Sequence, residues 1–90
     1  MTFEWDDNKN VSNKMKHGIS FEEAKRLWND PFRVEIQISF PDEDRSILIG
    51  RMDNKIWTAV FTFREDSIRI ISVRRARKKE ASLYGSEQDS

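Results

Sequence analysis

The hydrophobic pattern changes its period at residue 33, and this change constrains the fold more than any other feature of the sequence. Apolar side chains then occupy every second position, at Val34, Ile36, Ile38 and Phe40. Such alternation is typical of a strand with one buried and one solvent-exposed face. Further strand patterns, separated by short turns, follow, so we predict strands over 33–40, 45–51, 56–64 and 67–74. Strands joined by such short turns predict an antiparallel meander.

The chain before residue 33 has helical periodicity. After a short strand over 3–5, we predict a helix over 7–17, with Asp6 as its N-cap and Gly18 as its left-handed C-terminal residue. Its apolar stripe is narrow, consisting of Val11 and Met15. Its opposite, polar face is expected to carry Lys9, Asn13, Lys16 and His17.

Two further helices are expected. Ser20 and Glu23 fit a capping box at the start of the second helix, which Pro31 ends. The third helix is predicted over 76–84, with Gly85 ending it. Its inward-facing candidates are Ala76, Glu80, Leu83 and Tyr84.

The 90-residue length predicts a single small α+β domain over 1–85, with 86–90 as a disordered tail. In it, two N-terminal helices and a C-terminal helix pack around the antiparallel sheet. Apolar residues make up only 37% of the chain, so its ten aromatic side chains must supply much of the core. We therefore interpret Trp57, Phe61 and Phe63 as a core stripe rather than as an RNA-stacking platform.

Composition excludes several classes of protein. Without Cys and with one His, a thiolate metal site and a thiol nucleophile are both impossible. No apolar run approaches the roughly 20 residues of a membrane span, and the N-terminus does not resemble a secretory signal, so we expect a cytoplasmic protein. The acidic clusters at 6–7 and 42–44 are better explained as a helix start and a turn than as Mg²⁺ ligands, and we expect no cofactor.

The net charge of zero conceals two oppositely charged halves. Residues 1–44 carry six Lys or Arg against ten Asp or Glu, whereas 45–90 carry ten against six. Five cations fall within 74–79. This basic run could be a solvated helix start, or it could hold a phosphate backbone or an acidic partner.

Two motifs together resemble the BrnT family of bacterial toxins, and the resemblance extends from Phe3 to Tyr84. The first is KHG at 16–18 followed by SFEEA at 20–24, and the second is IRIIS at 68–72 followed by Arg74 and Arg75. The resemblance implies a RelE-like fold and a ribonuclease of a type II toxin–antitoxin pair. It also implies a BrnA-like antitoxin that dimerises and binds operator DNA through a ribbon-helix-helix domain.

Metal-independent RNA cleavage uses the neighbouring 2′-hydroxyl as nucleophile, so the protein must hold the phosphate, stabilise its charge and move two protons. The candidates for holding phosphate are Arg64, Arg74 and Arg75. Strand alternation predicts that Arg74 lies with Ser72 on one face and Arg75 with Arg69 on the other. We favour Arg74 with Arg64. The alternative is that these arginines form cross-strand ion pairs with Glu35, Glu65 or Asp66.

The candidates for proton transfer are His17, Glu80 and Tyr84. Each has a structural alternative: His17 could interact with the helix dipole, Glu80 could pair with Arg77 or Lys79, and Tyr84 could cover the sheet. We expect further RNA contacts from Lys9, Lys16, Arg69, Arg77, Lys78 and Lys79.

The sequence therefore predicts a metal-independent endoribonuclease toxin that inhibits translation and growth. One alternative is a non-catalytic binding module whose basic surface engages an acidic partner or nucleic acid. Another is a small structural subunit without a nucleic-acid role.

Overall fold

The computed structural model describes residues 2–39, 41 and 43–88, and it confirms the predicted α+β class. In chain order its elements are β1 (Thr2–Glu4), α1 (Asp7–His17), α2 (Phe21–Ala24), the 3₁₀ helix η1 (Lys25–Asn29), β2 (Val34–Ser39), β3 (Asp44–Met52), β4 (Lys55–Arg64), β5 (Ser67–Arg75) and α3 (Lys78–Gln88).

The five strands form one sheet in the order β1-β5-β4-β3-β2. The predicted antiparallel meander is confirmed for β2 to β5. The sheet is mixed, however, because β1 pairs in parallel with β5 and places Phe3 beside Ile68. The strand β5 therefore has a neighbour on each side, as its largely apolar sequence predicts.

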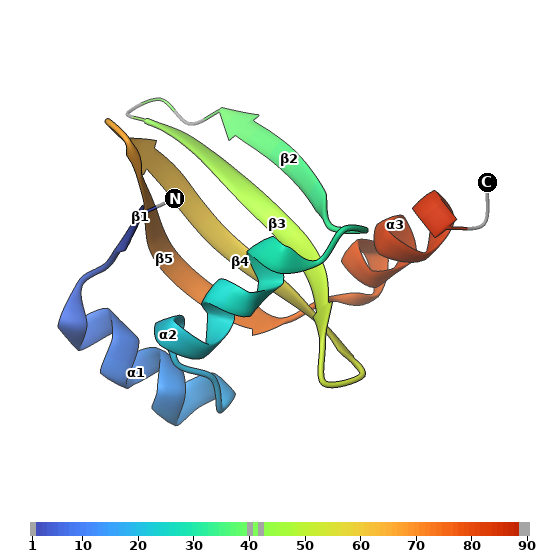
Figure 1. The fold of residues 1–90 in the computed structure, drawn as a ribbon, viewed down its shortest axis with the longest axis horizontal. Coiled ribbons are helices and arrows are strands. Elements are labelled where there is room, and N and C mark those ends of the chain that lie inside the picture. The colour runs from blue at the N-terminus through green and yellow to red at the C-terminus, as the bar shows by residue number, and fades with distance from the viewer. Residues whose placement is uncertain (1, 40, 42, 89–90) are drawn as a thin grey trace.

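The predicted helix caps are confirmed. The Asp6 carboxylate accepts hydrogen bonds from the amides of Asn8 and Lys9, at 2.8 and 3.3 Å, and Gly18 has a left-handed φ of 74°. The Ser20 and Glu23 side chains form both bonds of the capping box. As Figure 1 shows, α1, α2 and η1 lie along one face of the sheet, and α3 lies at the end of the sheet away from β1.

The core lies between the sheet and these N-terminal helices. Phe21 and Leu27 from the helices and Phe61 from β4 are fully buried in it. Phe63 does not belong to this core, contrary to the prediction. It is 62% exposed because it lies near the end of β4, and its ring makes only an edge contact with Phe61.

The orientation of α1 also differs from the prediction. Val11 and Met15 face solvent, being 59% and 83% exposed, whereas the polar Asn13 is buried. Its amide Nδ2 donates to the carbonyl of Ile19 at 2.9 Å, and its Oδ1 accepts from the amide of Val73 at 3.0 Å. Buried backbone groups must find partners, so satisfying them outweighs burying two apolar side chains.

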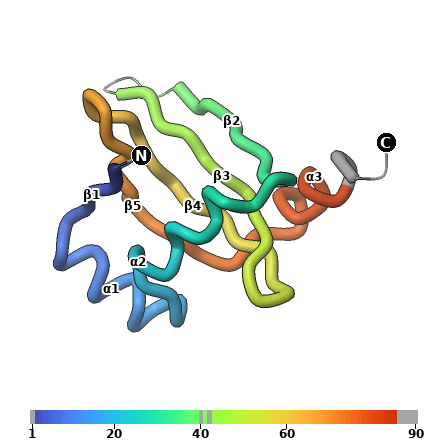
Figure 2. Tube along the Cα trace, in the orientation of Figure 1, coloured from blue at the N-terminus to red at the C-terminus, as the bar shows by residue number. Residues whose placement is uncertain are grey.

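The C-terminal helix α3 does not end at Gly85 as predicted. It continues to Gln88, because Gly85 lies within the helix without a positive φ. Glu80 and Tyr84 face inward as expected, but Leu83 is 45% exposed. The last two residues of the predicted tail, 89–90, lie outside the described residues. Figure 2 shows that the chain after η1 reaches α3 before it turns into β2.

Candidate functional site

A β-bulge in β5 decides which arginines share a face of the sheet. Ser72 pairs with Val60 and Ile70 pairs with Phe61, so Ile71 is an extra residue between them. The extra residue reverses the alternation of side chains along the strand.

Arg69 is consequently placed opposite Thr62, and Arg74 opposite Thr58. The prediction that Arg69 shares a face with Arg75 is therefore wrong. Arg69 and Arg74 both lie on the side of the sheet opposite α1, α2 and η1. We call this side the open face; on β4 it carries Thr58, Val60, Thr62 and Arg64. Arg75, opposite Trp57, points to the other side, as predicted.

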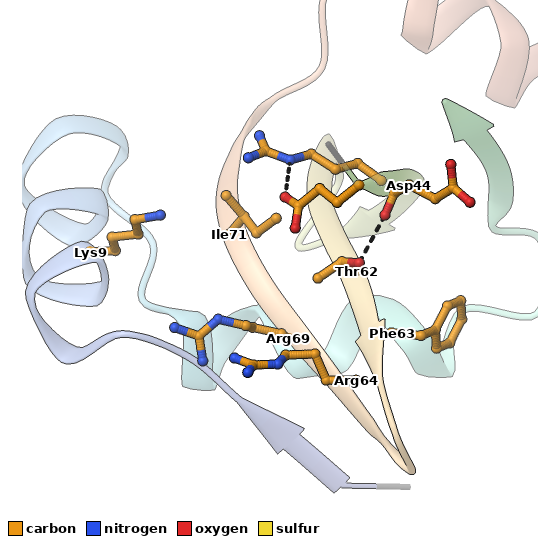
Figure 3. Close-up of a pocket in the computed structure, with 9 residues that line it drawn as sticks. Lys9, Asp44, Thr62, Phe63, Arg64, Arg69 and Ile71 are labelled. Carbon is orange, nitrogen blue, oxygen red and sulfur yellow. Dashed lines mark hydrogen bonds and ion pairs between the residues drawn. The ribbon is translucent and has the colours of Figure 1, made fainter. Parts of the chain in front are cut away.

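A hollow of about 630 Å³ opens where the end of β4 meets the starts of β3 and β5. Its lining residues are Lys9, Glu43, Asp44, Arg45, Thr62, Phe63, Arg64, Arg69 and Ile71. In Figure 3, Lys9 approaches from α1 and faces Arg64 and Arg69 across it. We call it the cationic hollow, because four cationic side chains and two carboxylates line it.

Two cations of the cationic hollow are held by carboxylates, and two are not. Arg69 pairs with Glu4 of β1 at 3.1 Å, and Arg45 pairs with Glu43 at 2.7 Å. Among the described residues, Lys9 and Arg64 form no ion pair or hydrogen bond through their side chains. Unpaired cations beside restrained guanidinium groups create a positive local field, which attracts anions.

Arg74 does not join Arg64, contrary to the favoured arrangement. Arg74 of β5 is paired with Thr58 of β4, which is six residues, or roughly 20 Å of extended strand, from Arg64. Arg74 instead forms two hydrogen bonds to Glu80, Nη1 to Oε1 at 2.7 Å and Nη2 to Oε2 at 2.9 Å. The alternative of an ion pair is thus observed for Arg74, but its partner is on α3 rather than across the sheet.

Glu80 is hydrogen-bonded at both carboxylate oxygens. Besides Arg74, it accepts hydrogen bonds from the amide of Arg77 at 2.7 Å and the hydroxyl of Thr58 at 3.0 Å. The Arg74 guanidinium, together with these two donors, lowers the pKa of Glu80 to about 2 despite its burial. A carboxylate held so far below neutral pH is a weak proton acceptor, and its contacts fix the start of α3.

His17 and Arg75 line another, smaller hollow of about 290 Å³, together with Lys55 and Trp57. The Arg75 guanidinium lies 5.7 Å from the centre of the Trp57 ring. The structure thus brings one proton-transfer candidate and one phosphate-binding candidate together, on the side of the sheet away from the cationic hollow. His17 is also in the last turn of α1, where its structural alternative places it.

Tyr84 lies apart from both hollows and is buried. Its hydroxyl donates to Asp30 Oδ2 at 2.7 Å, and the Arg51 guanidinium lies 5.6 Å from its ring centre. Burial raises the pKa of Asp30, but the amides of Arg51 and Phe32 and the Tyr84 hydroxyl together lower it below its ordinary value. Tyr84 therefore links α3 to the segment after η1.

The remaining candidates are exposed and lie in two separate parts of the chain. Lys16 lies on α1, and the basic run supplies Arg77, Lys78 and Lys79 at the start of α3. These residues do not line the cationic hollow.

Sequence reasoning missed Arg45, Glu43, Thr62 and Ile71 as lining residues of the cationic hollow. The meander itself contains a signal for three of them, because it brings the start of the 45–51 strand and the end of the 56–64 strand to one end of the sheet. The position of Ile71 depends on the bulge.

Within residues 2–39, 41 and 43–88, no three His, Cys, Asp or Glu side chains are grouped so that they could hold a metal ion. The helices of this part of the chain are too short or too polar to cross a membrane. Asp42, from the weaker magnesium alternative, lies outside the described residues.

A comparison with protein families supplies the biological context for this cationic site. The family model described as the ribonuclease toxin BrnT of type II toxin–antitoxin systems matches residues 5–80. A comparison with curated individual proteins gave no match. A type II toxin has an antitoxin as its partner, so the family also implies this partner. Because the match covers most of the sequence, the chain belongs to the BrnT family of ribonuclease toxins of type II toxin–antitoxin systems.

Proposed function

We propose that this ribonuclease toxin is a metal-independent endoribonuclease that binds the scissile phosphate of RNA in the cationic hollow. The observation that carries the proposal is that Lys9 faces Arg64 and Arg69 across this hollow (Figure 3), and that Lys9 and Arg64 are unpaired in the described part of the chain. Three positive charges converging on one phosphate provide the electrostatic stabilisation that the transition state needs.

Arg64 and Arg69 would hold the phosphate. A guanidinium grips two phosphate oxygens at once and keeps its charge as the negative charge of the transition state grows. Arg69 is restrained by Glu4, whereas Arg64 is free to close on the substrate.

Two proton transfers accompany in-line attack by the 2′-hydroxyl. Glu43 would accept the hydroxyl proton, since the other lining carboxylate, Asp44, points away from Arg64 and Arg69 in Figure 3. The Lys9 ammonium would donate a proton to the departing 5′-oxygen, because an arginine does not release its proton. The products would be a 2′,3′-cyclic phosphate and a 5′-hydroxyl.

A second position for the chemistry is the hollow that contains His17 and Arg75. It is favoured by the presence of an imidazole and a guanidinium in one small space. Its two lining carboxylates, Glu23 and Asp53, equal its lysine and arginine side chains in number, whereas the cationic hollow has four such cations against two carboxylates. We therefore place the reaction in the cationic hollow.

The antitoxin partner would be a BrnA-like protein that dimerises and binds operator DNA through a ribbon-helix-helix domain. This part of the proposal rests on the sequence motifs and on family membership.

The decisive experiment is to incubate purified protein with a defined RNA in excess EDTA and to identify the new ends. Cleavage in EDTA that leaves 2′,3′-cyclic phosphate ends is the expected result. RNA that is bound but remains intact would instead indicate the non-catalytic binding module. Loss of cleavage in His17→Ala with full activity in Arg64→Ala would move the reaction to the smaller hollow.

A further inference from the structure

A stripe of aliphatic side chains crosses the middle of the open face. Ile36, Ile47 and Val60 are neighbours across β2, β3 and β4. Ile38 follows on the same face of β2, and Ile71 lines the cationic hollow. We call these five residues the aliphatic stripe. All of them are partly exposed, and Ile38 is 38% exposed.

The neighbouring elements leave this stripe uncovered. The helices α1, α2 and η1 cover the opposite face of the sheet, and α3 reaches the open face at Thr58, where Glu80 is bound. The stripe therefore lies between α3 at one end and the cationic hollow at the other. A continuous apolar surface of this kind on a small domain is typical of an interaction site.

We propose that the aliphatic stripe and the cationic hollow together form the docking surface for an acidic, amphipathic segment of the antitoxin. Apolar side chains of that segment would cover Ile36, Ile47 and Val60. Its carboxylates would reach Lys9, Arg64 and Arg69, whose charge they complement. The consequence for inhibition rests on the proposed function, because the same cations would bind the scissile phosphate.

The chemistry of the stripe favours a protein over RNA as its occupant. Sheets that bind single-stranded RNA present aromatic rings on which bases stack, whereas every member of this stripe is aliphatic. A second copy of this chain is also disfavoured. A two-fold symmetric contact places the same surface on itself, which would bring the two cationic hollows toward each other.

Docking of this kind makes antitoxin and RNA mutually exclusive. A segment that lies along the stripe and places carboxylates in the cationic hollow occupies the positions proposed for the phosphate. Neutralisation would then result from direct occlusion of the site, without a change in the fold of the toxin.

The test uses the full chain, its co-expressed antitoxin and a fluorogenic RNA in EDTA. Ile38→Glu and Val60→Glu each place a negative charge on the stripe, and Met15→Glu is the matched control on exposed α1. We expect the two stripe variants to cleave RNA within twofold of the parent rate. They should need at least tenfold more antitoxin for half-inhibition, whereas Met15→Glu should behave like the parent.

Two controls keep the outcomes distinct. Thermal unfolding checks each variant, and Ile38→Glu decides the result if Val60→Glu does not fold, because Ile38 is the more exposed residue. If the parent chain does not cleave RNA, the proposed function fails, and the dissociation constant for the antitoxin tests docking independently. Unchanged antitoxin affinity in a folded stripe variant overturns the inference. A toxin dimer that Ile38→Glu dissociates, or a stable complex of toxin, antitoxin and RNA, also overturns it.

Discussion

Arg74 and Glu80 form a bidentate ion pair that joins the end of β5 to the first turn of α3, with side-chain exposures of only 23% and 16%. The Glu80 carboxylate also accepts a hydrogen bond from the Arg77 amide, so Glu80 holds both the contact with the sheet and the start of the helix. This contact gives Arg74 a structural role that a basic run in the sequence does not reveal.

We expect Arg74→Ala to lower the free energy of unfolding by about 2 to 3 kcal/mol, because it leaves the half-buried Glu80 without its main partner. Chemical denaturation measures the change, with exposed Lys79→Ala as the control. Combining Arg74→Ala with Glu80→Ala should recover part of the loss, since neither charge then remains unpaired. If the free-energy losses of the two single variants simply add in the double variant, Arg74 and Glu80 are not energetically coupled.

The low pKa of Glu80 makes stability depend on pH. The pKa is about 2 in the folded chain against an ordinary value of 4.5, so the stabilisation is fully present above pH 4.5. It is lost as the pH falls toward 2, and it amounts to at most about 3 kcal/mol. Unfolding measured from pH 6 to pH 2 should show a shallower decline for Glu80→Gln. If the free energy of unfolding falls in parallel with pH in the parent and in Glu80→Gln, the low pKa of Glu80 is refuted.

Arg64→Ala should lower kcat/KM for RNA cleavage by roughly 10- to 100-fold, which corresponds to the loss of a charge-assisted phosphate contact. Its thermal midpoint should stay unchanged, because Arg64 has no ion pair in the described structure. Arg26→Ala is the control, since Arg26 forms only an exposed pair with Asp53. Equal losses in both variants would point to a general charge effect.

Asn13→Ala should destabilise the fold by about 2 to 4 kcal/mol, because it leaves the Val73 amide and the Ile19 carbonyl without partners in a buried site. The thermal midpoint should fall by roughly 10 °C or more for a chain of this length. Asn8→Ala, in the exposed first turn of α1, is the matched control. A midpoint within a few degrees of the parent value would show that water replaces the amide.

Two glycines should respond in opposite directions to alanine. Gly85→Ala should stabilise α3 by about 0.5 to 1 kcal/mol, because Gly85 lies inside a helix and no neighbouring atom obstructs a Cβ. Gly18→Ala should cost about 1 kcal/mol, since its φ of 74° strains any residue with a side chain. Thermal unfolding compares the two variants. A loss of stability in Gly85→Ala would contradict the continuation of α3 to Gln88.

Local patterns predicted most of the fold. The alternation at Val34 and Ile36, and the caps at Asp6, Gly18 and Ser20, are each set by residues close in sequence, and each is confirmed. For the candidate site, alternation correctly placed Arg74 and Arg75 on opposite faces, but the favoured grouping of Arg74 with Arg64 is wrong, because Arg74 is bound to Glu80 far from Arg64 along the sheet. The incorrect grouping of Arg69 with Arg75 arose because strict alternation was carried through Ile71, where the bulge interrupts it.

The sequence alone determined most of the elements of this protein, since capping, periodicity and turn chemistry act over a few residues. Only the tertiary structure decided which side of α1 is buried and which cations meet. These outcomes depend on pairing between distant segments: Asn13 turns inward to satisfy the amide of Val73, 60 residues away, and the register between β4 and β5 turns Arg69 toward Lys9. Hydrogen bonding of a buried backbone amide, rather than the hydrophobic pattern, decided the orientation of α1, and the bulge at Ile71 decided the face of Arg69.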